Sequence, residues 1–531
     1  MSSSSADRVM VVGSGVAGLI TALRLAPLPV LLVTEGALGA GGATAWAQGG
    51  IAAAVGPDDD AGLHAQDTLA AGTGLGDPRV ARDVAAEAAT IIGMLRQWGV
   101  PFDQDAGGKP ALTLEAAHSR RRILHAGGDG TGAALIRTLA ARARASGTID
   151  LAEHCSAEDL LVEDGRVAGA LLRRGGTLAP VAARAVVLAT GGIGGLYAST
   201  TNPAGTWGSG LALAARAGGE LRDLEFVQFH PTAIAIAAAA RRDAPLPLAS
   251  EAIRGEGGVL VDDLGLPVMS GVPGGDLAPR DCVARAIWKH MEAGRRVFLD
   301  ARDALGPRFP RRFPAITALC RAAGIDPVSQ PIPVRPAAHY HMGGISTDRR
   351  GRTSLPGLWA VGEVASTGLH GANRLASNSL IEAAVFGRRA AADIRHTSRP
   401  CCLPHSGDRL TALQANAPGS PAIPAVEAEL RRRMDDAVGV VRDRDGLQTT
   451  LAWLSGLRDT SAEDGPLRRK VEVALMITAA ALARTESRGA HTRRDFPAAD
   501  PGWARHQAVE PERVRPAARP LTVLSLGDQP A

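Results

Sequence analysis

The chain has 531 residues, of which 45% are hydrophobic and 21% charged, and its formal net charge is +4. A chain of this length folds into several domains and can bury a large core. The small net charge, and the lack of a basic run interleaved with aromatic residues, argue against nucleic acid as a partner.

The cysteines and the apolar runs favour a soluble, cytoplasmic protein. The five cysteines are scattered and lack CxxC spacing, which argues against a disulfide framework, a zinc site or an iron–sulfur cluster. The first residues contain no apolar segment of the kind found in a signal peptide. The longest apolar runs, such as residues 233–240, are too short to cross a bilayer, so we expect no membrane partner.

A glycine-rich turn near the N-terminus predicts a dinucleotide-binding fold. An uncharged apolar run, residues 9–12, leads into Gly13-x-Gly15-x-x-Gly18 and then into apolar residues at helical spacing. The first glycine makes the turn, the second lets a pyrophosphate approach the backbone, and the third lets the helix pack on the strand. A second strand, residues 30–34, ends in Glu35, where an acid would bind a ribose hydroxyl. This pattern leaves NAD and FAD open.

The next segment, residues 36–51, is too rich in glycine for a helix or strand. It is either a flexible loop or a backbone that lies against a flat ligand, and its place beside the nucleotide fold favours the second. Apolar spacing predicts helices over residues 79–98 and 131–145. Glu115 lies between them in a polar segment, where site residues are often found, and at least one of the arginines at 120–122 is expected in solvent.

The composition of the chain and the length of its predicted elements change at residue 224. Residues 158–190 alternate strands and turns, and residues 207–217 continue as a helix, whereas residues 224–339 hold many prolines and short elements. Another buried strand then ends at Glu363, and a helix starts at Ser379. We therefore predict a nucleotide-binding domain in two parts (1–223 and 340–410), an inserted domain (224–339) and a helical domain (411–531), with a linker over 398–424.

Clusters of arginine and histidine border the cleft expected between the two domains. They are Gln228–Thr232 with Glu251 and Arg254, Arg280–Asp281 with Arg285, and His339–His341 with Arg374–Ser379. Paired guanidinium groups suit carboxylates because each can grip two oxygens, so the clusters indicate a small dicarboxylate substrate. The pair His339-x-His341 lacks an evident third ligand, and no metal is expected.

Taken together, these motifs resemble the succinate dehydrogenase/fumarate reductase flavoprotein family. The resemblance covers nearly the whole chain and rests on Thr44–Gly50, His230–Thr232, Arg254–Gly257, Pro279–Asp281, His339–Gly344, Asn373–Leu380 and Glu486–His491. It implies an α/β fold in which a Rossmann-like FAD-binding domain is interrupted by an α+β capping domain and followed by a C-terminal three-helix bundle.

The resemblance also implies FAD as the cofactor and a set of residues around it. The implied cofactor-binding residues are Gly13, Ser14, Gly15, Val16, Ala17, Gly18, Glu35, Ala43, Thr44, Ala45, Trp46, Ala47, Gln48, Gly49, Gly50, Ser209, Glu363, Ser379 and Leu380. The helix that starts at Ser379 would aim its positive end at the pyrimidine edge of the flavin and stabilise the negative charge of its reduced form.

The implied catalytic residues are Arg280, Glu115, His230, Arg254, His339 and Arg374, and the implied substrate-binding residues are Thr232, Glu251 and Ser377. The histidines and Arg374 would hold the substrate carboxylates. Arg280 matches the arginine that transfers a proton in this family, although arginine is a poor base in water because its pKa exceeds ~12.

Two features resemble the branch of the family that oxidises L-aspartate. Ala43 stands where membrane succinate dehydrogenases attach FAD through histidine, which implies noncovalent FAD. Glu115 lies where a carboxylate would pair with the substrate ammonium, a group that succinate lacks. The implied reaction gives iminosuccinate, with O₂ (forming peroxide) or fumarate as electron acceptor, and hands the product to quinolinate synthase on the route to NAD.

Two alternatives stay open, a soluble fumarate reductase or succinate dehydrogenase flavoprotein, and a non-catalytic flavin-binding subunit. The full set of arginines and histidines argues against the second. The chain also departs from the oxidising branch: Glu35 stands where lysine is common, Ser209 where aspartate is usual, and Ala116–Ala117 in place of a glycine pair. The first two would weaken FAD binding, and the third would shift Glu115.

Overall fold

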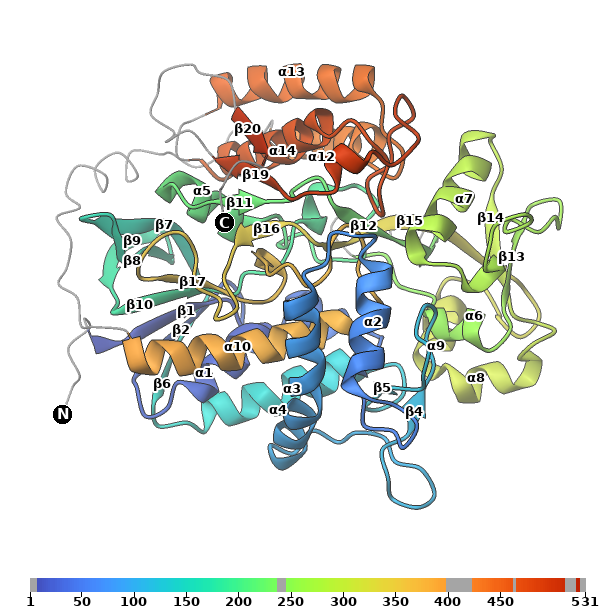
Figure 1. Cartoon of the computed structure of the whole chain (residues 1–531), viewed down its shortest axis with the longest axis horizontal. Helices are drawn as coiled ribbons and strands as arrows, with labels where there is room; N and C mark the ends of the chain where they lie inside the picture. The colour runs from blue at the N-terminus through green and yellow to red at the C-terminus, as the bar shows by residue number, and fades with distance from the viewer. Residues whose placement is uncertain (1–6, 236–244, 398–422, 462–464, 511–521, 526–531) are drawn as a thin grey trace.

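The structure is a computed structural model that describes residues 7–235, 245–397, 423–461, 465–510 and 522–525. The linker predicted over 398–424 lies outside the described residues except for its last two. Figure 1 shows a central sheet, a separate unit at one end and a group of C-terminal helices on one side.

A five-stranded parallel sheet forms the centre of the fold, in the order β17-β10-β1-β2-β6. Its strands are β1 (Val9–Val12), β2 (Val30–Thr34), β6 (Ile149–Glu153), β10 (Ala185–Leu188) and β17 (Leu358–Ala360). Four of these are the buried strands expected from short uncharged apolar runs, which suit parallel strands covered on both faces. The strand from far downstream, β17, pairs directly with β10, as the two-part nucleotide domain requires.

Alternate residues of β1 enter two different hydrophobic cores. Val9 and Val11 pack with one set of helices, whereas Met10 and Val12 face the opposite side. The first core is covered by α1 (Val16–Arg24), α3 (Pro78–Gln97), α4 (Thr131–Arg144) and α10 (Asn378–Thr397). The second is covered by the antiparallel strands β7 (Cys155–Glu163), β8 (Arg166–Arg174) and β9 (Thr177–Ala182), together with α5 (Ser209–Ala217). The fold is therefore the layered α/β arrangement that the sequence predicts.

A smaller unit lies at one end of the molecule, coloured green to yellow in Figure 1. Its antiparallel sheet runs in the order β12-β15-β14-β13, with β12 (Val227–Ile234), β13 (Val259–Asp262), β14 (Val297–Asp300) and β15 (Ile332–His341). The helices α6 (Glu251–Gly255), α7 (Arg280–Glu292), α8 (Phe309–Arg312) and α9 (Pro314–Ala322) accompany it. The boundary predicted between residues 339 and 340 falls inside β15, so this strand carries the chain out of the unit.

A third group of elements follows β2 and covers one end of the nucleotide fold. It consists of β3 (Ile51–Ala52), α2 (Ala61–Ala71), β4 (Leu112–Thr113) and β5 (Ile123–Leu124). The three strands form a small antiparallel sheet, with β5 between β3 and β4.

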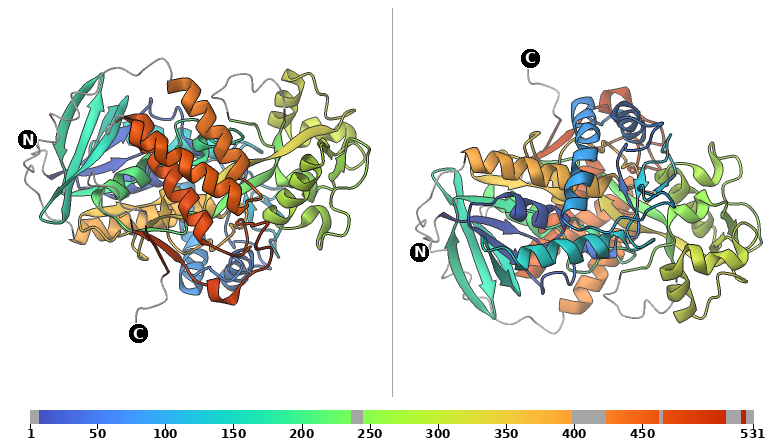
Figure 2. Two further views of the ribbon diagram at one scale, coloured as in Figure 1. Left: turned by 90° about the horizontal axis from the view of Figure 1, so that it is seen from above. Right: turned by 90° about the horizontal axis from the view of Figure 1, so that it is seen from below.

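The C-terminal part contributes α12 (Ile423–Ala437), α13 (Arg444–Thr460) and α14 (Pro466–Ala483), which cross the molecule in the view from above (Figure 2). Their apolar faces join the second core, so this bundle packs on the nucleotide domain. A further sheet, in the order β18-β16-β11-β19-β20, contains β11 (Leu221–Arg222), β16 (Gly344–Ser346), β18 (Ala365–Ser366), β19 (Gln507–Glu510) and β20 (Thr522–Ser525). It brings β19 and β20 beside the start of the inserted unit.

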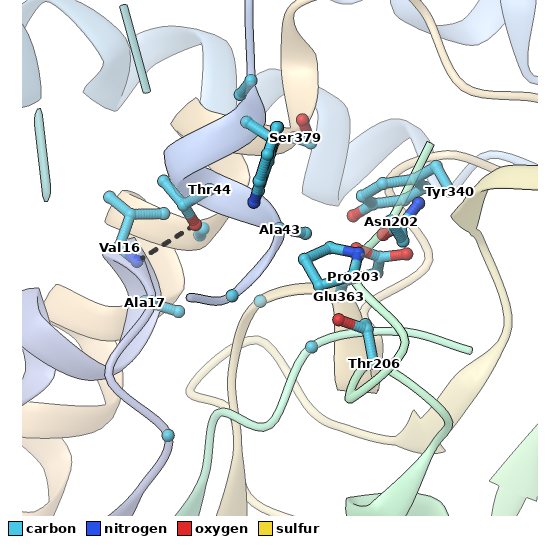
Figure 3. Close-up of a pocket in the computed structure, with 18 of the residues that line it drawn as sticks. Val16, Ala17, Ala43, Thr44, Asn202, Pro203, Thr206, Tyr340, Glu363 and Ser379 are labelled. Carbon is cyan, nitrogen blue, oxygen red and sulfur yellow. Dashed lines mark hydrogen bonds between the residues drawn. The ribbon is translucent and has the colours of Figure 1, made fainter. Parts of the chain in front are cut away.

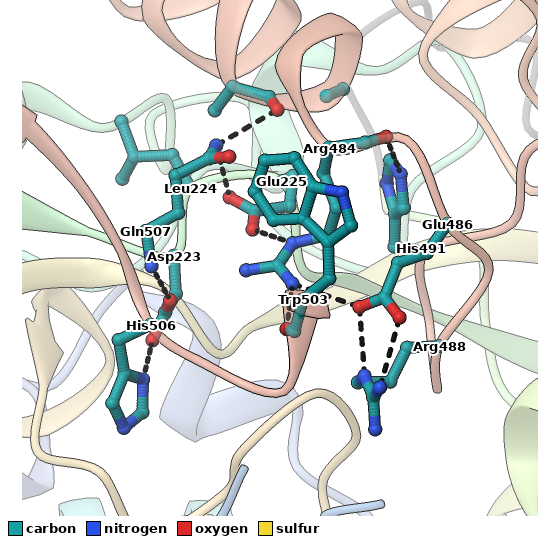
Figure 4. A network of polar contacts seen from close by, with 12 residues as sticks. Asp223, Leu224, Glu225, Arg484, Glu486, Arg488, His491, Trp503, His506 and Gln507 are labelled. Atoms are coloured by element: carbon teal, nitrogen blue, oxygen red, sulfur yellow. Dashed lines mark hydrogen bonds and ion pairs between the residues drawn. The ribbon is translucent and has the colours of Figure 1, made fainter. Parts of the chain in front are cut away.

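Buried charges fasten this C-terminal segment to the connection between β11 and β12 (Figure 4). Arg484 Nε donates to Glu225 Oε1 at 2.5 Å, and both side chains are fully buried. His506 Nδ1 lies 2.6 Å from Asp223 Oδ2. The C-terminal segment thus holds the point at which the chain enters the inserted unit. None of the helices in the described ranges is both long and apolar enough to cross a membrane.

Candidate active site

A cavity of about 530 Å³ runs between the nucleotide fold and the inserted unit. One part is lined by the turn after β1, the end of β2, the glycine-rich segment and the turn after β10. The other part is lined by side chains of the inserted unit and of residues 374–380. The cavity therefore lies at the cleft predicted from the domain organisation.

The turn after β1 is shaped for close approach of a ligand. Gly13 has φ +111°, and a Cβ added there would lie 2.2 Å from the carbonyl oxygen of Ala189. Gly15 caps α1 with no side-chain hydrogen bond, so the first N–H groups of the helix, apart from that of Val16, are left for a ligand. The positive end of the helix dipole makes this turn a site for an anion such as pyrophosphate.

Gly18 has the packing role predicted for it. It does not line the cavity, and an added Cβ would lie 1.9 Å from the carbonyl oxygen of Gly13. Ser14 lines the cavity, and its hydroxyl shares a 2.8 Å hydrogen bond with that of Thr34 at the end of β2.

The glycine-rich segment is more regular than the sequence predicts. Residues Ala43–Trp46 form a short 3-10 helix, which corrects the expectation of a segment without helix. Thr44 Oγ1 accepts a hydrogen bond of 3.4 Å from the backbone N–H of Val16, so the segment is tied to the start of α1 (Figure 3). All of residues 43–50 except Ala45 line the cavity. The segment thus forms one wall of the site.

The part of the cavity near α10 carries polar atoms that lack partners. Gln48 Oε1, Thr190 Oγ1 and Asn202 Oδ1 are buried without a hydrogen bond, and all three residues line the cavity. Ser379 and Leu380 lie in the first turn of α10 beside them. Figure 3 shows Glu363, Asn202 and Tyr340 around this space. Buried polar groups are normally satisfied, so these atoms fit a large polar ligand such as a flavin nucleotide.

Glu363 accepts a hydrogen bond from the backbone N–H of His341 at 3.0 Å. Burial raises the pKa of this carboxyl to about 7. Two of the three departures from the family pattern, Glu35 and Ser209, line the cavity. Burial, and then the charge of Glu158, raise the pKa of Glu35. Protonation would lessen its repulsion of an anionic nucleotide.

Arg280 is held in a fixed orientation at the start of α7. Its Nε and Nη2 atoms donate to the two oxygens of Glu251 at 3.0 and 2.9 Å, and its Nη1 donates to Gln228 Oε1 at 3.0 Å. Arg254 Nη2 donates to the same carboxylate at 3.0 Å, and its Nη1 donates to the carbonyl oxygen of Asp276. The neighbouring guanidinium groups outweigh burial and hold the pKa of Glu251 at about 2, so it is ionised.

Arg374 also donates to Gln228, the acceptor that it shares with Arg280. Its Nη2 donates to Gln228 Oε1 at 3.1 Å, its Nη1 donates to Ser379 Oγ at 3.0 Å, and its guanidinium carbon lies 4.4 Å from the ring centroid of Tyr340. Burial and the charge of Arg280 lower the pKa of Arg374 to about 10, which leaves it charged at neutral pH. Two guanidinium groups therefore border one cavity.

Two neutral histidines stand beside these arginines. The rings of His230 and His339 meet edge to face with centroids 5.1 Å apart. Burial, followed by the charge of Arg280, lowers the pKa of each ring well below its usual value. His230 Nδ1 accepts from the backbone N–H of Thr232 at 3.2 Å, so its Nε2 carries the proton and can donate. His339 Nδ1 shares a 2.8 Å hydrogen bond with the hydroxyl of Thr201.

His341 does not join His339 at the cavity. Its Nε2 donates to the carbonyl oxygen of Leu224 at 3.0 Å, and the residue does not line the cavity. Within the described parts of the chain, no three His, Cys, Asp or Glu side chains are placed to hold a metal ion.

Glu115 is the remaining ionisable group of the site. Its side chain is only 4% exposed, and its Oε2 accepts from Ser377 Oγ at 2.7 Å. Burial, and then repulsion by Glu251, raise the pKa of this carboxyl. The site thus combines two guanidinium groups and two neutral histidines with the ionised Glu251 and with Glu115, whose pKa is raised.

The structure brings most of the predicted catalytic and substrate-binding residues to one cavity. Those that line it are Glu115, His230, Glu251, Arg280, His339, Arg374 and Ser377. Thr232 and Arg254 stand behind this wall. The hydroxyl of Thr232 donates to the carbonyl oxygen of Ala249 at 2.8 Å, and Arg254 donates to Glu251, so these two residues support the wall and do not line the cavity.

Gln228 and Tyr340 belong to the site although no catalytic or binding role was predicted for them. Gln228 receives hydrogen bonds from both arginines and donates from Nε2 to Asn373 Oδ1 at 2.9 Å. Gln228 lies two residues before His230, and Tyr340 directly follows His339. Their place in these two motifs is the feature of the sequence that points to them. Thr201 and Asn202 lie in a polar loop with no distinctive pattern, so only the structure places them at the cavity.

Comparison with known families matches two parts of the chain. The family described as FAD binding domain matches residues 8–380. The family described as fumarate reductase flavoprotein C-term matches residues 460–526.

Similar proteins cover nearly the whole chain. A protein of Agrobacterium fabrum named L-aspartate oxidase is 52% identical over 492 residues, which are 92% of this chain and 91% of its own. A protein of the same name from Xylella fastidiosa is 49% identical, covering 93% of this chain and 92% of its own. Among solved structures, a variant of E. coli quinol fumarate reductase FrdA superposes with a TM-score of 0.88 at 31% identity, covering 98% of this chain and 96% of its own.

Proposed function

The chain belongs to the L-aspartate oxidase family of FAD-binding flavoproteins, and we propose that it oxidises L-aspartate to iminosuccinate. In this role it would catalyse the first step of the route through quinolinate to NAD, and would supply its product to quinolinate synthase. The electron acceptor that completes the cycle is O₂, giving hydrogen peroxide, or fumarate.

The observation that carries this proposal is a buried carboxyl placed in a dicarboxylate site. Arg280, Arg374, His230 and His339 offer cationic or neutral donors for two carboxylates. Glu115 lines the same cavity and would disfavour a plain dicarboxylate when ionised. An ammonium group on the substrate removes this conflict, because it pairs with the carboxylate. The cavity is therefore complementary to an amino dicarboxylate.

We assign the binding of the substrate carboxylates to Arg374 and the two histidines. Arg374 is fixed by Gln228, Ser379 and the face of Tyr340, so little orientational freedom remains to be lost on binding. The Nε2–H of His230 can donate without adding a further charge to a site that already contains two guanidinium groups.

Oxidation of the C–N bond to C=N removes a hydride from carbon and a proton from nitrogen. We assign the proton transfer to Arg280, which lines the cavity and would take up this proton as it passes one of its own to Glu251. Glu251 is joined in turn to Arg254, which donates to the carbonyl oxygen of Asp276. Asp276 is half-buried, so this chain of hydrogen bonds leads from the cavity towards the surface. The ionised Glu251 keeps both guanidinium groups in line.

FAD, when bound, supplies the acceptor for the hydride. Gly13–Ala17 would hold its pyrophosphate, and residues 43–50 would lie against its flat rings. The first turn of α10, at Ser379 and Leu380, directs the positive end of its dipole into the cavity and would stabilise negative charge there. Ala43 offers no nucleophile, so the cofactor is held without a covalent bond; acid precipitation should release all of the flavin into the supernatant.

The test is the flavin absorbance of the purified protein before and after anaerobic addition of L-aspartate. We expect bleaching of the visible flavin band by L-aspartate, and peroxide formation once air is admitted. Succinate serves as the matched control, since it has the same two carboxylates without the ammonium group.

A different result would assign the protein to the fumarate reductases that it resembles in fold. An absence of bleaching by L-aspartate, together with fumarate reduction by an artificial electron donor, would overturn the proposal. A protein that binds flavin but supports neither reaction would instead be a non-catalytic flavin-binding subunit.

A further inference from the structure

A fully buried arginine lies beside the active site but does not line its cavity. Arg122 directly precedes β5, and its side chain has no exposed surface. Its Nε and Nη2 atoms donate to the two oxygens of Asp59, each at 2.8 Å, and its Nη1 donates to Asp67 Oδ2 at 2.6 Å. This charge is therefore fixed at three points and cannot rotate.

His118 connects this arginine to the wall of the cavity. Its Nε2 donates to the carbonyl oxygen of Ala376 at 3.0 Å, because a carbonyl oxygen can only accept. Its Nδ1 then has a free lone pair, which faces Arg122 Nη1 at 3.5 Å. Burial lowers the pKa of His118 to about 4, so the ring is neutral and this tautomer is stable at neutral pH.

His118 thus joins the segment that contains Glu115 to the segment that contains Ser377, and these two residues form a hydrogen bond with each other. Ser377, which follows Ala376, donates to Glu115 Oε2 at 2.7 Å, and the backbone N–H of His118 donates back to the carbonyl oxygen of Glu115 at 3.2 Å. Ala117 and Ser377 have φ values of +65° and +60°, which side chains rarely adopt. Such conformations persist only where surrounding contacts hold them, and His118 contacts both segments.

The other groups of the active site are held by different contacts. Arg280 is fixed by Glu251 and Gln228, and His339 by Thr201. Arg374 is fixed by Gln228, Ser379 and Tyr340. None of these contacts involves Arg122 or His118. Loss of the buried connection should therefore displace Glu115 and leave the carboxylate-binding groups in place.

We propose that Arg122 and His118 are positioning residues that set the selectivity of the site for an amino dicarboxylate over a plain dicarboxylate. They do so by fixing Glu115 and Ser377 where the substrate ammonium group is received. This inference rests on the function proposed above, and it assigns a task to two residues that do not touch the substrate.

The test compares two reactions in the FAD-loaded protein, L-aspartate oxidation and fumarate reduction by an artificial donor. In His118→Leu, which cannot donate to Ala376, we expect kcat/KM for L-aspartate to fall roughly 100-fold, the loss typical of a displacement of about 1 Å. For fumarate we expect kcat/KM to stay within about threefold. His118→Gln keeps an N–H near the same place and should recover part of the aspartate activity.

The matched control is Arg121→Leu, because Arg121 is the exposed neighbour of Arg122. Both of its activities should change by no more than about twofold, as for other surface substitutions. If His118→Leu fails to retain FAD, Arg122→Lys is measured in the same way, since it keeps the charge but loses the two-pronged grip on Asp59.

Equal losses in both reactions, with either variant, would overturn the positioning role. Unchanged aspartate activity in His118→Leu would overturn it as well. A wild-type protein that does not oxidise L-aspartate would instead refute the proposed function, so the two failures are distinguishable.

Discussion

At the scale of single residues, the uncharged side chain of Gln228 joins the two cations of the site, Arg280 and Arg374. Arg280 and Arg374 both donate to Gln228 Oε1, at 3.0 and 3.1 Å, and Glu251 offsets the charge of only one of them. The excess positive charge lies on side chains that are largely buried, where it attracts carboxylates more strongly than in water. In the proposed function, Glu115 adds the requirement for an ammonium group.

The first prediction concerns Arg280. In Arg280→Leu we expect kcat for aspartate oxidation to fall roughly 10²–10⁴-fold, the range for loss of a general acid or base, with flavin still bound. Single-turnover bleaching of the flavin by L-aspartate measures this loss directly. Arg285→Leu, one turn further along α7 and paired with Asp281, is the control. Rapid bleaching in Arg280→Leu would remove this arginine from the mechanism.

The second prediction concerns the pH dependence of binding. Burial raises the pKa of Glu115, so its carboxylate becomes protonated as pH falls, sooner than an exposed glutamate would. Because only the ionised form pairs with ammonium, affinity for L-aspartate should weaken as pH is lowered through this raised pKa. Affinity for succinate should not weaken in that way.

Flavin absorbance titrations with both ligands over a series of pH values measure this effect. Glu115→Gln should lose the pH dependence and bind L-aspartate about 10–100-fold more weakly, since a hydrogen bond to a charged group contributes about 1.5–3 kcal/mol. Identical pH profiles for the two ligands in the wild-type protein would exclude Glu115 as the ammonium partner.

At the scale of elements, the wall of the cofactor site depends on a helix that does not line it. Gly132, in the first turn of α4, donates its N–H to the carbonyl oxygen of Ala47 at 3.0 Å. A Cβ added to Gly132 would lie 1.9 Å from the carbonyl oxygen of Thr44. The start of α4 thus supports the 3-10 helix at residues 43–46.

The third prediction follows from this contact. Gly132→Ala should displace residues 44–47 and weaken FAD binding about tenfold or more, because overpacking of this kind costs about 1–3 kcal/mol. Fluorescence of released flavin on dilution measures the affinity. At Gly147 an added Cβ meets nothing within 4 Å, so Gly147→Ala is the control. Equal affinities in the two variants would show that α4 does not support this wall.

At the scale of the whole molecule, the C-terminal segment closes the structure over the entrance to the inserted unit. Arg442 Nη1 donates to the carbonyl oxygen of Glu225 at 2.7 Å, and Arg484 pairs with the carboxylate of the same residue. The preceding residue, Leu224, accepts a hydrogen bond at its carbonyl oxygen from Nε2 of His341, which lies at the end of β15. Both connections of the inserted unit are therefore held at one buried point (Figure 4).

The fourth prediction concerns this buried charge. Arg484→Leu leaves the carboxylates of Glu225 and Glu486 without their shared partner, and we expect a loss of about 3–5 kcal/mol in the free energy of unfolding. Arg458→Leu removes a surface pair with Asp459 and should cost at most about 1 kcal/mol. Urea unfolding followed by intrinsic fluorescence compares the two variants. Similar midpoints would mean that the buried pair adds no net stability.

The sequence alone determined the nucleotide fold and the chemical character of the site. The turn Gly13-x-Gly15-x-x-Gly18 and the short apolar runs are local patterns, and the physics that makes them strands and turns acts over a few residues. Paired arginines and histidines indicated a dicarboxylate for a similar reason, since the hydrogen-bond donors that a side chain carries are set by its residue type. The glycine-rich segment was the local exception, because its 3-10 helix depends on a contact with α4.

Only the tertiary structure decided which side chains are buried, and with which partners. The sequence does not distinguish the three consecutive arginines at 120–122, yet only Arg122 is buried. It pairs with Asp59 and Asp67, which lie about sixty residues earlier in the chain. Thr232 and Arg254 carry the right chemistry but stand behind the wall of the cavity. Burial and pairing arise from contacts between distant segments, and these contacts raise the pKa of Glu115 and fix the position of its carboxyl group.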